Sequence, residues 1–181
     1  VLVESRRSVY GHLAGAASGR QLNFYENGLL LGAEDDQLAS EQLVHYPMLA
    51  HARPRRVLLL GTGATGALGE ILKHGPERVD HVELDPLWIA LAKKYAAPAR
   101  RAALADPRVR TVFDDARRFL RRRSLETPAA GYDVAIVNLP NPGTALINRG
   151  YTREFFRDVR RRLAPGGVLA VRLAFSPDYL G

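Results

Sequence analysis

Apolar and mixed segments alternate along the chain after residue 55. The short apolar runs have the composition of strands that are buried on both faces, at 57–60, 78–84, 109–113, 132–137 and 168–173. The segments between them follow helical periodicity, at 66–74, 86–96, 116–123 and 153–164. Because strands that alternate with helices through short links form parallel sheets with right-handed crossovers, the pattern predicts a doubly wound parallel α/β sheet.

Capping and turn residues agree with these boundaries. Asp85 is placed to cap the helix that Pro86 begins, and Thr152 precedes the helix at 153–164. Asp106-Pro107 marks a turn before the third strand, and the run NLPNPG at 138–143 excludes helix or strand there.

The first 35 residues follow a different pattern. Candidate strands lie at 9–13, 21–25 and 29–31, with the loop GAASG between the first two and the turn Asn27-Gly28 between the last two. We therefore expect a small N-terminal antiparallel β-hairpin segment over 1–35 and a Rossmann-like nucleoside-binding domain over 36–181. A helix from residue 37 or 40 to 51 would join them, and Pro47 leaves open whether it starts late, kinks or divides.

The most informative motif is the glycine run GTGATG, which follows the first strand of the sheet. Gly61, Gly63 and Gly66 allow a tight turn and a close approach of backbone to a ligand. Glu83 ends the second strand roughly 20 residues further on, the spacing at which an acidic side chain reaches a ribose hydroxyl. Strand, turn, helix and acid together predict a nucleoside-binding site of the Rossmann type.

Four strand ends are expected to meet at one crevice. They carry the glycine turn, Glu83, the pair Asp114-Asp115, and the loop from Asn138 to Gly143. Ligands of open parallel sheets bind at the carboxyl ends of the strands, where the strand order reverses.

The choice of cofactor rests on charge. The glycine run lacks the Lys-Ser/Thr of a phosphate-gripping loop, which disfavours hydrolysis of ATP or GTP, although its spacing keeps a nicotinamide dinucleotide open. An acid at the end of the third strand can accept a hydrogen bond from an adenine amino group, which leaves Glu83 for the ribose. Two acids without a basic clamp favour S-adenosylmethionine or its decarboxylated form, which carry a sulfonium and no phosphate.

Composition limits the alternatives further. The chain has no cysteine, which excludes disulfides and thiolate sites and is compatible with a cytoplasmic protein. Its five histidines form no metal-binding spacing, so no metal is expected, and no apolar run is long enough to span a membrane. The net charge of +7 is concentrated in arginines of two predicted helices, a pattern more typical of solvated faces than of nucleic-acid binding. The chain lacks an initiator Met and ends just after a strand, so we expect a segment of a longer protein, truncated at its C-terminus.

Most of the chain, from Phe24 to Val171, resembles the polyamine aminopropyltransferases, the spermidine synthase family. The matching segments occur in the family's order: FYENG, VLLLGTGATGALGEILKH, VELDP, DPRVRTVFDDARRFL, YDVAIVNLPNP and YTREFFRDVRRRLAPGGVLA. The resemblance implies a methyltransferase-type Rossmann doubly wound parallel sheet behind a small N-terminal antiparallel β-hairpin segment. It also implies transfer of an aminopropyl group to a small-molecule amine, and it suggests a homodimer.

The departures from the family lie where the resemblance places the chemistry. The two aspartates of the family's catalytic loop are Asn138 and Asn141 here, and the aspartate of its glycine turn is Ala64. A carboxylate can take a proton and pair with an ammonium, whereas an amide can do neither. We therefore expect impaired processing of a polycationic amine, unless Glu34, Asp35 and Asp36 supply the missing charge.

The resulting hypothesis is a spermidine synthase-like transferase. Asn138 is the expected catalytic residue, and Tyr46 and Asn141 are expected at the amine. The cofactor-binding residues are expected to be Gly61, Gly63, Glu83, Asp115 and Ala116. Two alternatives remain open: an S-adenosylmethionine-dependent methyltransferase that uses the same pocket, and a catalytically silent nucleoside-binding domain.

Overall fold

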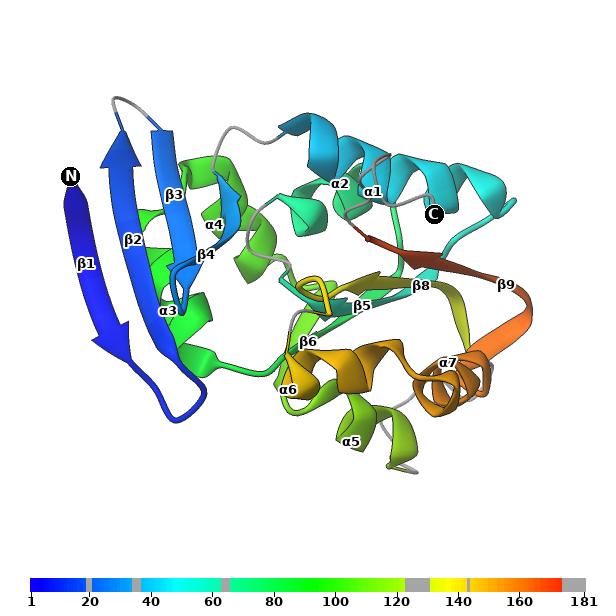
Figure 1. Cartoon of the computed structure of the whole chain (residues 1–181). Helices are drawn as coiled ribbons and strands as arrows, with labels where there is room; N and C mark the ends of the chain where they lie inside the picture. The colour runs from blue at the N-terminus through cyan, green and yellow to red at the C-terminus, as the bar shows by residue number, and fades with distance from the viewer. Residues whose placement is uncertain (19–20, 34–36, 63–65, 123–130, 143, 174–181) are drawn as a thin grey trace, which may run out of the picture.

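The chain folds into two sheets with helices around the larger one (Figure 1). This is a computed structural model, and it describes residues 1–18, 21–33, 37–62, 66–122, 131–142 and 144–173. A four-stranded antiparallel sheet is formed by the N-terminal residues, and a five-stranded sheet by the rest.

The five-stranded sheet is parallel throughout and has the strand order β7-β6-β5-β8-β9. Its strands are β5 (Arg56–Gly61), β6 (Arg78–Glu83), β7 (Val109–Phe113), β8 (Tyr132–Asn138) and β9 (Leu163–Val171). The chain moves outward from β5 to β6 and β7, and then returns to β8 on the other side of β5. The strand order therefore reverses between β5 and β8, which confirms the predicted doubly wound sheet and places its switch point beside Gly61.

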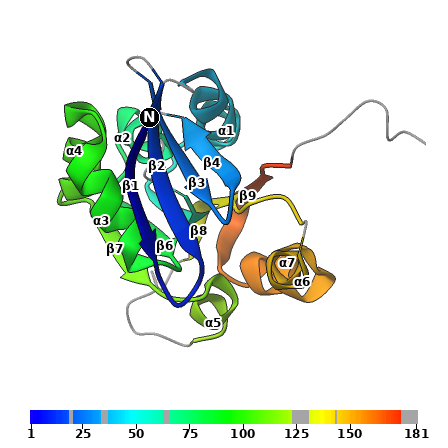
Figure 2. The ribbon, with the colours of Figure 1, turned by 60° about the vertical axis from the view of Figure 1, so that its left-hand side comes forward.

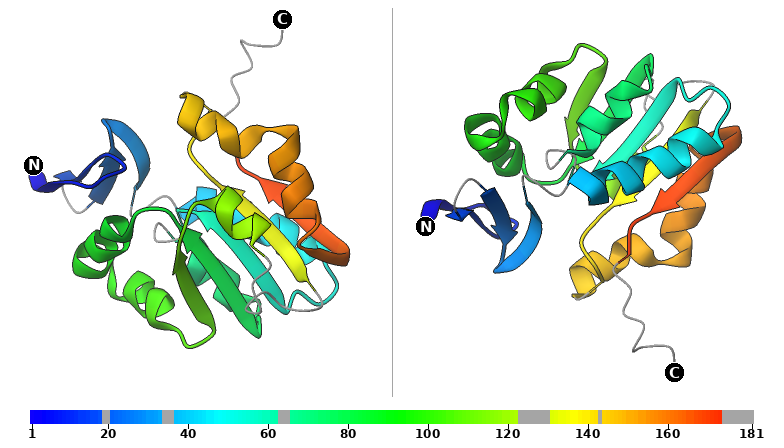
Figure 3. Two further views of the ribbon diagram at one scale, coloured as in Figure 1. Left: turned by 90° about the horizontal axis from the view of Figure 1, so that it is seen from below. Right: turned by 90° about the horizontal axis from the view of Figure 1, so that it is seen from above.

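Helices cover both faces of this sheet, as the two views of Figure 3 show. One face carries α1 (Gln37–Ala50), α2 (Ala67–Lys73), α3 (Pro86–Tyr95) and α4 (Pro98–Ala105). The other face carries α5 (Ala116–Arg121), α6 (Ala145–Asn148), the 3₁₀ turn η1 (Arg149–Tyr151) and α7 (Arg153–Arg160).

Successive residues of the central strand pack on opposite faces. Val57 and Leu59 belong to the core under α1 to α4, whereas Leu58 and Leu60 belong to the core under α5 and α7. All four side chains are fully buried. Because side chains alternate across a strand, a strand covered on both sides must be apolar at every position, which explains the unbroken run VLLL.

The N-terminal region is a small antiparallel sheet, as predicted, and it has four strands where three were expected. Its strands are β1 (Leu2–Arg7), β2 (His12–Ser18), β3 (Gln21–Glu26) and β4 (Leu29–Ala33). The run GAAS, which was predicted as a loop, is part of β2. Residues 8–11 form the turn between β1 and β2, where Ser8 N donates to Gly11 O at 2.8 Å. The small residues of β2 are accommodated because β1 and β3 pair on its two sides and supply the hydrogen bonds. The Asn27-Gly28 turn is as predicted, with both residues at positive φ.

This small sheet packs on α3, beside the parallel sheet (Figure 2). The Phe24 ring meets the Trp88 ring edge-on, with 4.8 Å between centroids, and Leu13 is buried in the same cluster. Lys94 on α3 pairs with Glu4 on β1 at 2.7 Å. This packing holds the tip of the β3–β4 hairpin close to the switch point of the parallel sheet.

Several element boundaries differ from those expected. The segment with Pro47 forms one continuous helix, α1, with the proline ring buried. The helices α4 and α6 were not predicted, and β9 begins at Leu163, five residues before the expected start, because Leu163 already pairs with Tyr132. The caps are as predicted: Asp85 accepts from Leu87 N at 2.9 Å, and Thr152 accepts from Phe155 N at 3.2 Å.

Candidate functional site

A cavity of about 600 Å³ opens at the carboxyl ends of the parallel strands. The residues that line it come from the ends of β5, β6, β7 and β8, from the N-terminus of α3, and from the β3–β4 hairpin. The structure brings together here most of the side chains expected at the site: Gly61, Glu83, Asp115, Ala116, Asn138 and Asn141.

The floor of the cavity is formed by the adjacent ends of β5 and β8, which are in close contact. Gly61 has φ of +95°, and a Cβ at this position would lie 2.9 Å from the carbonyl carbon of Asn138 and closer still to its oxygen. Thr62 N donates to the Asn138 carbonyl oxygen at 3.2 Å, and Asn138 Nδ2 donates to the Thr62 carbonyl oxygen at 2.6 Å. Only glycine fits at residue 61, and the Asn138 side-chain amide is oriented by Thr62, which directly follows β5.

His81 holds this floor from below. Its Nε2 lies 2.9 Å from the Gly61 carbonyl oxygen. Burial lowers the pKa of His81 to about 4, so the ring is neutral at physiological pH and donates its Nε2 proton to that oxygen. This role of His81 was not predicted from the sequence, because a lone histidine in a buried strand does not show which backbone group its ring will contact.

Glu83 presents an unsatisfied carboxylate oxygen at the cavity. Its Oε1 accepts from Leu84 N at 2.8 Å and from Asp85 N at 3.3 Å, whereas Oε2 is buried and has no hydrogen-bond partner. Burial raises the pKa of Glu83 to about 7, although the two backbone donors act in the opposite direction. A buried acceptor without a donor is costly unless a ligand hydroxyl or amine meets it.

Three further polar groups surround Glu83. Burial, and to a smaller extent the Asp85 charge, raises the pKa of Glu26 from the β3 strand. Asp85 Oδ2 and Trp88 Nε1 are both buried without a hydrogen-bond partner. This part of the cavity therefore combines the carboxyl groups of Glu26, Glu83 and Asp85 with one indole donor. The sequence showed that Glu26 precedes a hairpin turn, but not that this hairpin packs beside Glu83.

The two aspartates after β7 have different surroundings. Asp115 caps α5, accepting from Arg118 N at 3.0 Å, and it lines the cavity beside Ala116. Asp114 is buried and forms ion pairs with Arg118 and, at 3.1 Å, with Arg122. Asp114 is thus already neutralised within the protein, and Asp115 is the aspartate available to a ligand.

The side of the cavity formed by β8 and β9 carries no carboxylate among the described residues. Asn138 and Asn141 line it with Leu139, Pro140 and Arg172. Tyr151 OH donates to the carbonyl oxygens of Leu139 and Pro140, each at 2.9 Å, which fixes the loop after β8.

One expected residue does not line the cavity, and five other residues named from the sequence lie outside the described residues. Tyr46 lies on α1, where it is 72% exposed and does not line the cavity, because its helical position faces solvent while Val44, Pro47 and Met48 face the core. Gly63 and Ala64 lie outside the described residues, as do Glu34, Asp35 and Asp36.

The described residues contain neither a membrane-spanning helix nor a cluster of metal ligands. No helix among them combines the length and the apolar composition needed to cross a bilayer. In the same part of the chain, no group of three or more His, Asp or Glu side chains is placed to hold a metal ion.

Comparison with known proteins gives consistent matches. The Spermine/spermidine synthase domain matches residues 36–173. The polyamine aminopropyltransferase of Mycobacterium tuberculosis is 37% identical over 178 residues, which cover 97% of this chain and 33% of that protein. Polyamine aminopropyltransferase 2 of Streptomyces coelicolor is 42% identical over 164 residues, 88% of this chain and 28% of that protein. The chain thus spans about a third of the length of these relatives.

Solved structures show the same similarity. A spermidine synthase in complex with the transition-state analogue AdoDATO superposes with a TM-score of 0.85 at 26% identity, over 94% of this chain and 57% of that one. The spermidine synthase of Thermotoga maritima superposes with a TM-score of 0.79 at 26% identity, over 94% and 55%.

Proposed function

Since this chain belongs to the spermine/spermidine synthase domain family, we propose that it is the nucleoside-binding part of an aminopropyltransferase. The co-substrate would be decarboxylated S-adenosylmethionine, and the acceptor a small amine. The observation that carries the proposal is the buried Oε2 of Glu83, which has no hydrogen-bond partner and belongs to a side chain that lines the same cavity as Gly61. A relative of known structure was solved with a transition-state analogue, which supports an enzymatic role for this fold.

The nucleoside would lie along the ends of β5, β6 and β7. Glu83 would accept hydrogen bonds from the ribose hydroxyls through Oε2, which has no other partner. Asp115 would accept from the adenine amino group beside the small side chain of Ala116. The backbone of Gly61, and of Gly63 beyond the described residues, would approach the rest of the nucleoside.

The proposed reaction is a displacement at carbon. The lone pair of a neutral amine nitrogen attacks the methylene carbon that is bonded to the sulfonium. A C–N bond forms, the C–S bond breaks with its electron pair going to sulfur, and methylthioadenosine leaves. The new ammonium then loses a proton to solvent. The protein's contribution is to position the two reactants and to exclude water.

Asn138 is the proposed residue nearest the reacting carbon. Its Nδ2 is held by Thr62, so its Oδ1 is the atom left to accept an N–H of the incoming amine. An amide oxygen can orient that amine but cannot remove a proton from it. We therefore propose that Asn138 is a positioning group in the reaction, that Asn141 lies further out along the amine, and that the amine must arrive deprotonated.

Charge within the cavity agrees with a cationic co-substrate. Glu26 and Glu83 both have raised pKa values because burial disfavours their ionised forms. A sulfonium and an ammonium nearby would favour ionisation, so binding of the co-substrate should release protons.

A homodimer and a cytoplasmic location remain predictions from the sequence.

Product analysis tests this function. The chain would be incubated with decarboxylated S-adenosylmethionine and a panel of amines, and methylthioadenosine and aminopropylated products would be quantified. Glu83→Gln is the test variant, and Glu77→Gln is the matched control, because Glu77 is exposed and pairs with Arg55. We expect equimolar products that Glu83→Gln reduces and Glu77→Gln does not. Nucleoside binding without turnover on any amine would instead favour a silent nucleoside-binding domain.

A further inference from the structure

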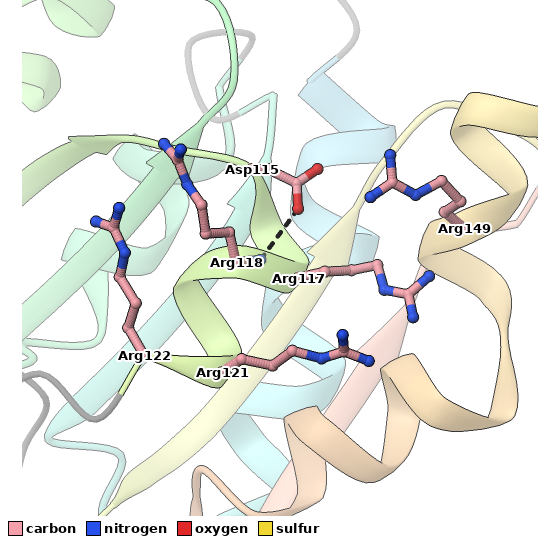
Figure 4. Close-up of a pocket in the computed structure, with 6 residues that line it drawn as sticks. All are labelled: Asp115, Arg117, Arg118, Arg121, Arg122 and Arg149. Carbon is pink, nitrogen blue, oxygen red and sulfur yellow. Dashed lines mark hydrogen bonds between the residues drawn. The ribbon is translucent and has the colours of Figure 1, made fainter.

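A second hollow, of about 490 Å³, adjoins the nucleoside cavity on the side of α5. It is lined by five arginines and one aspartate: Arg117, Arg118, Arg121, Arg122, Arg149 and Asp115 (Figure 4). We name it the arginine hollow. Asp115, Arg117 and Arg149 line both the arginine hollow and the nucleoside cavity, so the two spaces share a wall.

Carboxylates neutralise only part of this charge. Arg118 and Arg122 pair with Asp114, and Arg121 pairs with Asp158 on α7 at 2.8 Å. Among the described residues, neither Arg117 nor Arg149 forms an ion pair or a side-chain hydrogen bond. Arg117 contributes to lowering the pKa of Glu154, but Glu154 lies outside the lining of the hollow.

Three of the five guanidinium groups converge, and two of these, those of Arg117 and Arg149, have no ion-pair partner among the described residues. Figure 4 shows the side chains of Arg117, Arg121 and Arg149 extending into the same space between α5 and η1, whereas Arg118 and Arg122 extend to the opposite side of α5. Arg117 and Arg121 are four residues apart on the helix and so lie on one face of it. Asp158 compensates the charge of Arg121, but the charges of Arg117 and Arg149 repel each other unless an anion lies between them.

We infer that the arginine hollow binds a small phosphate-type anion such as pyrophosphate. The bound anion would strengthen binding of the cationic co-substrate in the adjoining nucleoside cavity. Guanidinium groups present paired N–H donors that match phosphate oxygens, and arginine is favoured wherever phosphate is recognised by geometry. This inference rests on the proposed function for the identity of the neighbouring ligand.

The sign of the coupling follows from charge. Decarboxylated S-adenosylmethionine carries a sulfonium and an ammonium, and Arg117 and Arg149 at the shared wall repel both. An anion in the hollow would pair with these same two arginines and so reduce the repulsion at its source, because Arg117 and Arg149 line both spaces. Methylthioadenosine is neutral, so the same anion should barely change its affinity.

Calorimetry on the whole chain tests anion binding directly. Pyrophosphate is titrated at constant ionic strength into the wild type, Arg117→Gln, Arg149→Gln and the control Arg101→Gln. Arg101 is exposed on α4, on the opposite face of the parallel sheet, and its replacement removes the same charge. We expect saturable binding that weakens by about tenfold in Arg117→Gln and Arg149→Gln and is unchanged in Arg101→Gln. Absence of saturable binding, or equal weakening in Arg101→Gln, would overturn the inference.

A second titration tests the coupling. The dissociation constants of decarboxylated S-adenosylmethionine and of methylthioadenosine are measured with and without saturating pyrophosphate. We expect the cation to bind about three- to tenfold more tightly with pyrophosphate and the neutral nucleoside to change less than about twofold. Equal changes for both nucleosides would contradict the coupling. If neither nucleoside binds while pyrophosphate does, the proposed function fails and the anion site stands.

Discussion

The two ends of the cavity differ in the charge of the side chains that line them. At the ends of β6 and β7, Glu83 and Asp115 offer carboxylates that are oriented by backbone donors. At the ends of β8 and β9, Asn138, Asn141 and Arg172 offer amides and a guanidinium. The first end is suited to hydroxyl and amino groups of a nucleoside, whereas the second end lacks a described carboxylate for an ammonium.

This contrast suggests that the two binding tasks of the site can vary separately. The nucleoside end depends on backbone geometry at a switch point, which few substitutions would preserve. The amine end depends on the side chains of Asn138, which ends β8, and of Asn141 in the loop that follows, and at both positions Asp and Asn are interchangeable in shape but not in charge. A substitution at one end should therefore change the binding of one ligand and leave the binding of the other unchanged.

The largest effect is expected from Gly61→Ala. An L residue at φ of +95° is strained, and the added Cβ would overlap the Asn138 carbonyl. We expect a loss of about 3 kcal/mol or more in the free energy of unfolding, together with loss of nucleoside binding. Urea denaturation and calorimetry with methylthioadenosine measure the two effects. Gly75→Ala is the control: Gly75 also has positive φ, but its Cβ would meet nothing within 4 Å, so it should lose only about 1 kcal/mol.

Glu83→Gln should weaken nucleoside binding at the carboxylate end. Losing one charged acceptor for the ribose hydroxyls is expected to cost about 1.5–3 kcal/mol of binding free energy at pH 8. Because the pKa of Glu83 is about 7, wild-type affinity should rise between pH 6 and pH 8 as the carboxylate ionises, and Glu83→Gln should remove that rise. Calorimetry at both pH values measures this, and a pH dependence that survives the substitution would remove Glu83 from the ribose site.

Glu83→Gln should increase the free energy of unfolding at pH 8, although it weakens nucleoside binding. Burial raises the pKa of Glu83 from 4.5 to about 7 in the folded state, so the folded protein holds a proton that the unfolded chain releases. The stability associated with this proton is complete below pH 4.5 and is lost as pH rises through 7, by up to about 3 kcal/mol. Urea denaturation of the unliganded chain at pH 8 should therefore show Glu83→Gln to be more stable than the wild type. Equal stability at pH 8 would contradict the raised pKa.

Asn141→Asp tests the amine end. Asn141 is exposed at the cavity mouth, so a carboxylate there pays little desolvation cost and can pair with an ammonium. We expect kcat/KM for putrescine to rise by about three- to tenfold while methylthioadenosine affinity is unchanged. Asn138→Asp is the contrasting variant, because it would lose the Nδ2 donor to Thr62 and bring a carboxylate against a carbonyl oxygen. No gain from Asn141→Asp on any diamine would remove Asn141 from the amine site.

The smallest effect is expected from Tyr46→Phe. Tyr46 is 72% exposed on α1 and does not line the cavity. We expect less than a twofold change in both nucleoside affinity and turnover. A larger change in KM for the amine would restore the role that the sequence analysis assigned to Tyr46.

The site could be predicted from the sequence where one local pattern determines it. Gly61 and Glu83 were identified because each directly ends an apolar strand, and the parallel topology brings such ends together. Tyr46, which rested on the resemblance alone, does not line the cavity, and a helical position faces core or solvent according to what packs on it. Glu26 and Trp88 were missed because they reach the cavity only through packing of the small sheet on α3.

The sequence by itself determined the alternation of buried strands and helices, the caps at Asp85 and Thr152, and the polar residue at each strand end. These depend on periodicity and on backbone chemistry within a few residues, which the chain carries at every point. Only the tertiary structure decided that the β3–β4 hairpin adjoins Glu83 and that Arg149 faces Arg117 across one hollow. Contacts between residues far apart in the chain depend on how whole elements pack against each other, and the local sequence does not show which elements will pack together.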